Sequence, residues 1–267
     1  MTKWRAQLEG FYSLVKELRQ NPERDCGLRF GRSVVVVSDI AEQFYCEKKV
    51  EMEYIHGKVE TEAKAIGTEA HEKLTEDSVK VNREQLWRDI YGDRPVFALE
   101  MLLLAKYGDV LLVGKPDSVL FGRGFPHVLF EYKFSKSDVD YLSYHVQAQT
   151  YCVLLDNMGF DTGKLSYVIV VADPKTKGSR ELRRAVVSTV LKSGLKETVW
   201  SVDGARVYVC KFNRATAKKN LDWALEFWRK SREAETTLNQ NKCARCEYKI
   251  QCQEPVDQTP SSNSSIC

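Results

Sequence analysis

The order of apolar runs in the middle of the chain places the tightest limit on its fold. HVLFEYKF (127–134) and LSYVIVVA (165–172) both have the composition of strands, and the residues between them are helical. A strand, a crossover helix and a second strand form a parallel pair in one sheet. A strand at 117–121 reaches 127–134 through the turn-forming GRGFPH, which predicts an antiparallel pair. The sequence therefore predicts an α/β fold with a mixed sheet flanked by helices.

Elements on either side extend this prediction. Further strands are expected at 96–106, at 109–114 and, along an edge of the sheet, at 207–212. Helices are expected at 1–20, from a cap at Ser38 or Asp39 through Cys46, and at 59–80, 83–91 and 215–236. Residues 174–204 are charged and rich in turn formers, so they are predicted to be an insertion or a mobile lobe. The chain then divides into a helical extension (1–32), a main domain (33–252) and a polar tail (253–267) expected to be disordered.

Charge and hydropathy limit the class of protein. The 267 residues include 40 basic and 37 acidic side chains, so the net charge of +3 predicts no strong field for a polyanion, although a local basic groove is compatible with it. The N-terminus reads as an amphipathic helix without the apolar core of a signal peptide, and no stretch is long enough to span a membrane. The expected location is the cytoplasm, where clustered cysteines hold metals more often than disulfides.

Two carboxylates and a lysine are predicted to meet at the hairpin. Glu131 and Lys133 share one face of their strand, Tyr132 takes the other, and antiparallel pairing brings Asp117 beside Glu131. Oxygen ligands suit Mg²⁺ or Mn²⁺, and a lysine can orient a water molecule or offset charge on a phosphate. The pattern is loose, and for these three residues alone surface charges on a hairpin are the better explanation.

Two further motifs favour a site over a charged surface. GTEAH (67–71) opens a helical stretch and offers His71 as an imidazole ligand, the alternative being an exposed helical histidine. Gln147 and Tyr151 are four residues apart and share one helical face. For these two residues the alternative is a helix former and a core aromatic.

The complete set of motifs resembles the RecB-type branch of the PD-(D/E)XK nucleases. The motif residues, in chain order, are His71, Asp117, Glu131, Lys133, Gln147 and Tyr151. The resemblance implies a restriction-endonuclease-like core that hydrolyses DNA with Mg²⁺ or Mn²⁺. By this resemblance Gln147 and Tyr151 form the edge of the site and bind the DNA backbone.

The same resemblance assigns the remaining roles. It implies that His71, Asp117 and Glu131 hold the catalytic cation, together with the backbone carbonyl of Tyr132. It also implies that Lys133 serves the attacking water.

Three cysteines, Cys243, Cys246 and Cys252, lie within ten residues near the end of the chain, one ligand short of a tetrahedral thiolate site. A branch of the same family carries an iron–sulfur cluster on one upstream cysteine and a final C-x-x-C-x(5)-C. By that resemblance Cys46 is the fourth ligand, and the N- and C-terminal segments form an iron–sulfur lobe. Four thiolates suit zinc or a [4Fe–4S] cluster, and the resemblance favours the cluster.

Other readings of the cysteines remain open. Cys26 is the rival to Cys46, which can also be a buried structural thiol. Cys152 and Cys210 fall in apolar segments and are expected in the core, whereas Cys267 lies on the polar tail.

Within this branch the chain is most similar to the CRISPR-associated RecB-like exonucleases of the Cas-four type. That implies an exonuclease acting on single-stranded DNA ends during spacer acquisition, with CRISPR integrase proteins as possible partners. The extension at 1–30 and the length of 174–204 depart from the compact members and leave the subfamily open. The alternatives are a repair or recombination exonuclease outside CRISPR, a non-catalytic iron–sulfur DNA-binding or assembly module, and a zinc-stabilised binding protein. The sequence indicates no oligomeric state.

Gripping a single strand requires basic and aromatic side chains. The candidates are Lys136, Tyr141, Tyr144 and His145, and a solvated approach to the helix is the alternative.

Overall fold

The computed structural model describes residues 2–20, 27–61, 68, 80–135, 139–174 and 179–252. Three residues with predicted roles, His71, Cys26 and Lys136, lie outside the described residues, as do Cys267, most of the predicted helix 59–80 and the predicted tail. No helix within the described part of the chain is long and apolar enough to cross a membrane.

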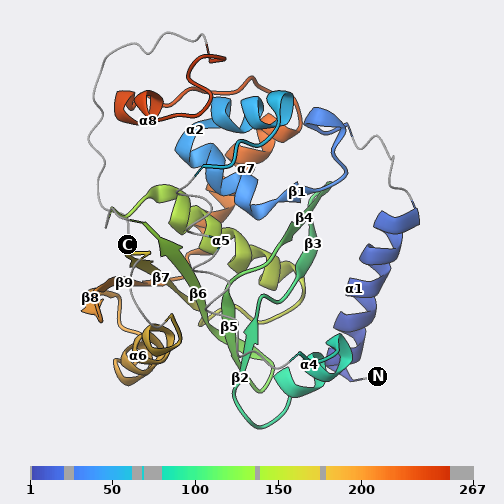
Figure 1. The fold of residues 1–267 in the computed structure, drawn as a ribbon. Helices are drawn as coiled ribbons and strands as arrows, with labels where there is room; N and C mark the ends of the chain where they lie inside the picture. The colour runs from blue at the N-terminus through green and yellow to red at the C-terminus, as the bar shows by residue number, and fades with distance from the viewer. Residues whose placement is uncertain are drawn as a thin grey trace.

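The helices group into an end cap and flanking layers (Figure 1). The helices are α1 (Lys3–Gln20), a 3₁₀ turn η1 (Arg29–Gly31), α2 (Val37–His56), α4 (Arg83–Ile90), α5 (Leu142–Asn157), α6 (Ser179–Lys192), α7 (Arg214–Trp228) and α8 (Gln240–Ala244). Figure 1 shows α2, α7 and α8 together at one end of the molecule, although α2 lies far from the other two in the sequence.

The larger sheet has six strands in the order β2-β5-β6-β7-β9-β8. Its strands are β2 (Val96–Leu99), β5 (Ser118–Gly122), β6 (Phe125–Phe134), β7 (Ser166–Ala172), β8 (Thr198–Val202) and β9 (Ala205–Lys211). β6 and β7 pair in parallel with Glu131 opposite Ile169, and α5 forms the crossover between them. β5 and β6 are antiparallel, so the predicted mixed sheet is confirmed.

The smaller sheet has three strands in the order β1-β4-β3. Its strands are β1 (Val35–Val36), β3 (Leu103–Tyr107) and β4 (Val110–Gly114). The prediction of one strand over 96–106 is wrong, because β2 and β3 belong to different sheets. The chain turns at Glu100, whose φ of 45° is left-handed and whose N–H donates to the main-chain oxygen of Asp117 at 3.1 Å.

The two faces of the larger sheet bury separate apolar cores. Alternate β6 residues such as Leu129 pack in the core that includes α5, whereas Phe130 and Tyr132 pack in the core that includes α6. Side chains alternate along a strand, so Glu131 and Lys133 lie on the α5 face. This is the face on which the predicted site residues can meet.

The prediction of 207–212 as an edge strand is wrong. β9 lies between β7 and β8, and β8 comes from the segment 174–204 that was predicted to be an insertion. The described part of that segment also supplies α6, which packs on the sheet through Leu182, Val186 and Val190. β9 is buried on both faces because Val207 and Val209 pack in the core that includes α6, whereas Tyr208 and Cys210 pack in the core that includes α5.

The predicted start and end of the second helix are also wrong. α2 begins at Val37 without a side-chain cap, and Asp39 instead accepts a hydrogen bond from the Tyr54 hydroxyl at 2.6 Å. The helix continues beyond Cys46 to His56, but it is kinked at Cys46, where φ is −171° and ψ is 118°. The extended backbone at this residue separates two helical arms.

Candidate functional site

Asp117 enters the site through the end of the β5–β6 hairpin. It directly precedes β5, whose Ser118 pairs with Phe130 of β6. One carboxylate oxygen of Asp117, Oδ2, accepts a hydrogen bond from the backbone N–H of Tyr132 at 2.6 Å. The carboxylate is thereby fixed against the strand that carries Glu131 and Lys133.

A chain of side-chain hydrogen bonds joins β6 to α5. The Lys133 amine donates to Glu131 Oε1 at 3.0 Å and to Gln147 Oε1 at 2.6 Å. The Gln147 amide in turn donates to the Tyr151 hydroxyl at 3.2 Å. Glu131 and Tyr151 are only 3% and 4% exposed, so the chain runs from a buried carboxylate to a buried phenol. The structure thus brings five predicted site residues, Asp117 included, to one face.

The charges of both carboxylates affect the pKa of the Tyr151 hydroxyl. Its pKa is raised well above the usual value, first by burial and then by the negative charges of Glu131 and Asp117, while Gln147 and the Lys115 backbone oppose the shift. Two carboxylates therefore lie within electrostatic reach of one hydroxyl. The phenol stays neutral and can both donate and accept a hydrogen bond.

Tyr132 takes part in the site only through its backbone. Its ring points to the opposite face, is 1% exposed and packs in the core under α6. Burial raises the pKa of its hydroxyl. The alternation predicted for 131–133 is confirmed, and the Tyr132 carbonyl remains a predicted metal ligand.

The donor set at this site suits a hard cation. Asp117 and Glu131 supply carboxylate oxygens, which Mg²⁺ and Mn²⁺ prefer. No group of three or more His, Cys, Asp or Glu side chains within the described residues is arranged to hold a metal ion by itself. The third side-chain ligand that was predicted, His71, lies outside those residues.

Gly114, at the end of β4, allows the side chains of Tyr151 and Val37 to lie close to the strand backbone. This residue was not identified from the sequence. A Cβ atom at this position would lie 2.5 Å from the Tyr151 ring and 2.8 Å from Val37. Only glycine therefore lets α5 and α2 pack here, and this packing fixes Tyr151 beside Gln147. A glycine at the end of an apolar strand is the signal that could have identified it.

A pocket of about 220 Å³ lies between α2 and the C-terminal segment. Four cysteines line it, namely Cys46, Cys243, Cys246 and Cys252. Burial raises the pKa of the Cys243 thiol, and Cys46 and Cys252 raise it further. Burial also raises the pKa of Cys246, and Cys46 adds to that shift. We refer to this as the cysteine pocket.

The other described cysteines are core residues, as predicted. Cys152 is 0% exposed and Cys210 is 1% exposed. Burial alone raises the pKa of the Cys152 thiol, which fits an unreactive core group.

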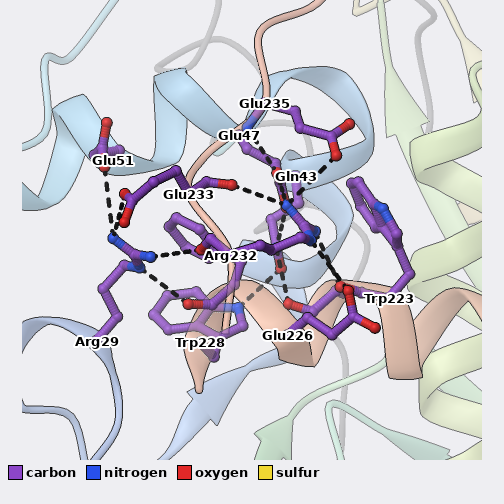
Figure 2. Close-up of polar contacts among 12 residues, drawn as sticks. Arg29, Gln43, Glu47, Glu51, Trp223, Glu226, Trp228, Arg232, Glu233 and Glu235 are labelled. Atoms are coloured by element: carbon purple, nitrogen blue, oxygen red, sulfur yellow. Dashed lines mark hydrogen bonds and ion pairs between the residues drawn. The ribbon is translucent and has the colours of Figure 1, made fainter. Parts of the chain in front are cut away.

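An ion pair between Glu47 and Arg232 joins α2 to the segment that follows α7 (Figure 2). Glu47 directly follows Cys46 and is 1% exposed. Its carboxylate accepts two hydrogen bonds from Arg232, at 2.5 and 2.8 Å, one from Gln43 at 2.7 Å and one from the backbone N–H of Glu235 at 2.9 Å. The segment that leads from α7 to the three C-terminal cysteines is thereby fixed to α2.

Arg29 adds a second connection to the same segment, also visible in Figure 2. It donates to the carbonyl oxygens of Phe227 at 2.9 Å and Arg232 at 2.7 Å. The indole N–H of Trp228 donates to Gln43 Oε1 at 2.8 Å, which orients that amide toward Glu47. Gln43 and Glu47 of α2 are thus both contacted by residues of α7 or of the segment that follows it.

The predicted strand-gripping residues do not share one environment. His145 is 3% exposed, with ring nitrogens 2.7 Å from Asp140 and 3.1 Å from the Tyr167 hydroxyl. The prediction that His145 contacts DNA is therefore wrong, because its ring faces the sheet. Tyr141 and Tyr144 are partly exposed.

One family model matches most of the chain. The family model of the PD-(D/E)XK nuclease superfamily matches residues 29–253. Eleven solved chains match; one of them, titled "Crystal structure of SSO0001", is 11% identical with a TM-score of 0.40, over 83% of this chain and 86% of that chain. No curated protein matches. Members of the superfamily are nucleases that typically use Mg²⁺ or Mn²⁺. The family match covers most of the chain, which belongs to the PD-(D/E)XK nuclease superfamily.

Proposed function

We propose that the chain is a metal-dependent DNA exonuclease that hydrolyses phosphodiester bonds at single-stranded ends. The observation that carries the proposal is the hydrogen-bonded chain from Glu131 through Lys133 and Gln147 to Tyr151, with Asp117 fixed beside it. A structural ion pair needs no such continuation into a second element. Membership of a nuclease superfamily supports a hydrolytic role for the same residues.

Asp117 and Glu131 would hold the divalent cation, together with the Tyr132 carbonyl and His71. Both carboxylates are fixed before any cation binds, Asp117 by the Tyr132 N–H and Glu131 by the Lys133 amine. A bound divalent cation supplies positive charge for the phosphate and lowers the pKa of a coordinated water. Fixed ligands need little rearrangement as charge develops on the phosphate.

Lys133 would orient the attacking water. An ammonium group has three N–H donors, and two of them are directed at Glu131 and Gln147. The third is available to a water molecule or to a phosphate oxygen. Gln147 acts through Lys133 as a positioning residue, and Tyr151 fixes the Gln147 amide from behind.

The first test is cleavage of single-stranded DNA that is labelled at one end. We expect the wild type to cut with Mg²⁺ or Mn²⁺, and Glu131→Gln to cut about 10³-fold more slowly because a charged ligand is lost. The labelled end reports the polarity of digestion. A circular single-stranded DNA distinguishes exonuclease from endonuclease activity, because an exonuclease leaves a circle intact. Equal rates for Glu131→Gln and wild type would overturn the site assignment.

We propose further that the cysteine pocket holds a [4Fe–4S] cluster. The four cysteines line one pocket, and four thiolates suit either a zinc ion or a four-iron cluster. The spacing of Cys243, Cys246 and Cys252, which resembles that of the iron–sulfur branch of these nucleases, favours the cluster. Cys46 and the last pocket cysteine, Cys252, are far apart in the sequence, so the cluster would close most of the chain and couple binding to folding.

If the cysteine pocket holds the cluster, loss of one cysteine ligand should change both the colour and the melting temperature of the protein. Anaerobically purified protein should be brown, and Cys246→Ala should lose the visible absorption, bind less iron and melt at a lower temperature. Cys267→Ala is the matched control and should retain both properties, because Cys267 belongs to the polar tail and lies outside the C-x-x-C-x(5)-C motif. Colourless protein with stoichiometric zinc would contradict the proposal.

The proposed biological role is the trimming of DNA for CRISPR spacer acquisition, beside integrase proteins. The motif order and the cysteine spacing support it through their similarity to the Cas-four type. Digestion of a short duplex with single-stranded overhangs down to a fixed length is the activity that this role requires.

A further inference from the structure

Three tyrosines form a row from the cysteine pocket to the candidate active site. Tyr45 of α2 lines the pocket, Tyr141 directly precedes α5, and Tyr144 lies in the first turn of α5. The ring centroids of Tyr45 and Tyr141 are 6.3 Å apart, and those of Tyr141 and Tyr144 are 5.4 Å apart. All three side chains are partly exposed. We call this set the tyrosine row.

Lysines stand at both ends of the tyrosine row. The Lys242 amine lies 4.3 Å from the centre of the Tyr45 ring and 5.9 Å from that of Tyr141. At the other end the Lys133 amine lies 5.4 Å from the centre of the Tyr144 ring. Lys49 also lies near Tyr45, but its amine is paired with Glu42 at 3.1 Å. Lys133 is paired as well, with Glu131 at 3.0 Å, and it has one further N–H donor, so Lys242 and Lys133 are the cations at the two ends of the row.

The tyrosine row ends beside the Lys133 amine, which belongs to the candidate active site. Tyr144, Gln147 and Tyr151 are spaced by three and four residues, so they share one face of α5. Lys133 contacts both the Tyr144 ring and Gln147. Tyrosine rings are neutral at physiological pH, so they do not repel phosphate.

We propose that the tyrosine row is the path along which a single DNA strand reaches the candidate active site, an inference that rests on the proposed nuclease function. The bases contact the tyrosine rings, and Lys242 and Lys133 attract the phosphates. Every base has an aromatic face, so this mode of binding tolerates any sequence.

The orientation of the rings favours a single strand over a duplex. Neighbouring ring planes are inclined by 67° and 84°, so the rings meet edge to face and their faces point in different directions, unlike the parallel stacked bases of a helix. Successive bases can meet successive rings only if they are unstacked from one another. Bases in a duplex are stacked and paired, so their faces are not open to such contacts.

Binding of a fluorescent oligothymidine without divalent cation tests the proposal, because no cleavage then occurs. Tyr141→Ala should weaken binding about tenfold, whereas Tyr141→Phe should bind like the wild type because the ring is retained. Tyr141 makes no side-chain cap to α5, so the substitution leaves the helix start intact. Tyr12→Ala is the matched control, since Tyr12 is a 48% exposed tyrosine on α1.

An abasic strand of equal length and charge isolates the contribution of the bases. The wild type should bind it about tenfold more weakly than oligothymidine, and Tyr141→Ala should show no comparable difference. Independently, Lys242→Gln should reduce the slope of log affinity against log salt by about 0.7, the value for one phosphate contact on a single strand.

The outcomes separate this inference from the proposed function. If the wild type cleaves DNA but Tyr141→Ala binds both strands like the wild type, the path is wrong and the nuclease stands. If the tyrosine variants lose base-dependent binding while no DNA is cut under any metal condition, the path is supported and the nuclease assignment fails.

Discussion

Replacing Lys133 with alanine is expected to slow DNA cleavage by about two to four orders of magnitude. The Lys133 amine donates hydrogen bonds to both the buried Glu131 carboxylate and Gln147. Without it, the attacking water loses its donor and the two side chains lose their common partner. The measurement is the single-turnover rate on end-labelled single-stranded DNA with saturating Mn²⁺.

Two comparisons make this result specific. Lys106→Ala removes a lysine of β3 that is paired with Glu17 at 3.0 Å and is 51% exposed, so it should cleave like the wild type. Gln147→Ala keeps the pair of Glu131 and Lys133 but leaves the amine less well oriented, and it should lose about tenfold. Melting temperatures recorded with Mn²⁺ identify any loss that is due to unfolding. A Lys133→Ala protein with wild-type rates would contradict the proposed mechanism.

Replacing Glu47 with alanine is expected to lower the free energy of unfolding by about 3–5 kcal/mol. Glu47 is 1% exposed and accepts four hydrogen bonds, two of them from Arg232. The variant leaves the Arg232 guanidinium, itself 17% exposed, without its main partner. Urea denaturation of the purified full chain measures the loss. Because Glu47 adjoins Cys46, the variant should also bind less iron.

The matched controls use a surface pair and a double variant. Glu84→Ala breaks a pair with Arg88 in which both side chains are more than half exposed, so it should cost no more than about 0.5 kcal/mol. Glu47→Ala combined with Arg232→Ala should be less destabilised than the sum of the single variants, because neither charge then remains unpaired. If Glu47→Ala lowers the free energy of unfolding by less than about 1 kcal/mol, this pair does not hold the segment after α7 to α2.

Much of the fold and site followed from local patterns. Strand alternation placed Glu131 and Lys133 on one face and the Tyr132 ring on the other, as the structure has them. Helical spacing predicted that Gln147 and Tyr151 share a face, and they are hydrogen-bonded at 3.2 Å. The period with which side chains face the same side depends only on whether the backbone is a strand or a helix. It can therefore be predicted from the sequence of each element alone.

Errors arose where the outcome depended on distant partners. The break at Glu100 is held by the main-chain oxygen of Asp117, and the inner position of β9 depends on β8 beside it. Residues 207–212 would be apolar in an edge strand and in an inner strand alike. Their pattern therefore could not predict that β8 lies beside them. His145 was expected at the surface because nothing nearby in the sequence predicted its contact with Tyr167.

The sequence by itself determined the mixed sheet, the residues that line its α5 face and the cysteines available to a metal site, because each follows from a short-range repeat or spacing. Only the tertiary structure decided that Glu47 pairs with Arg232, that Gly114 admits Tyr151, and that a tyrosine row joins the two sites. Those contacts join residues far apart in the chain, and they form only when packing brings α2, α5 and the segment after α7 together.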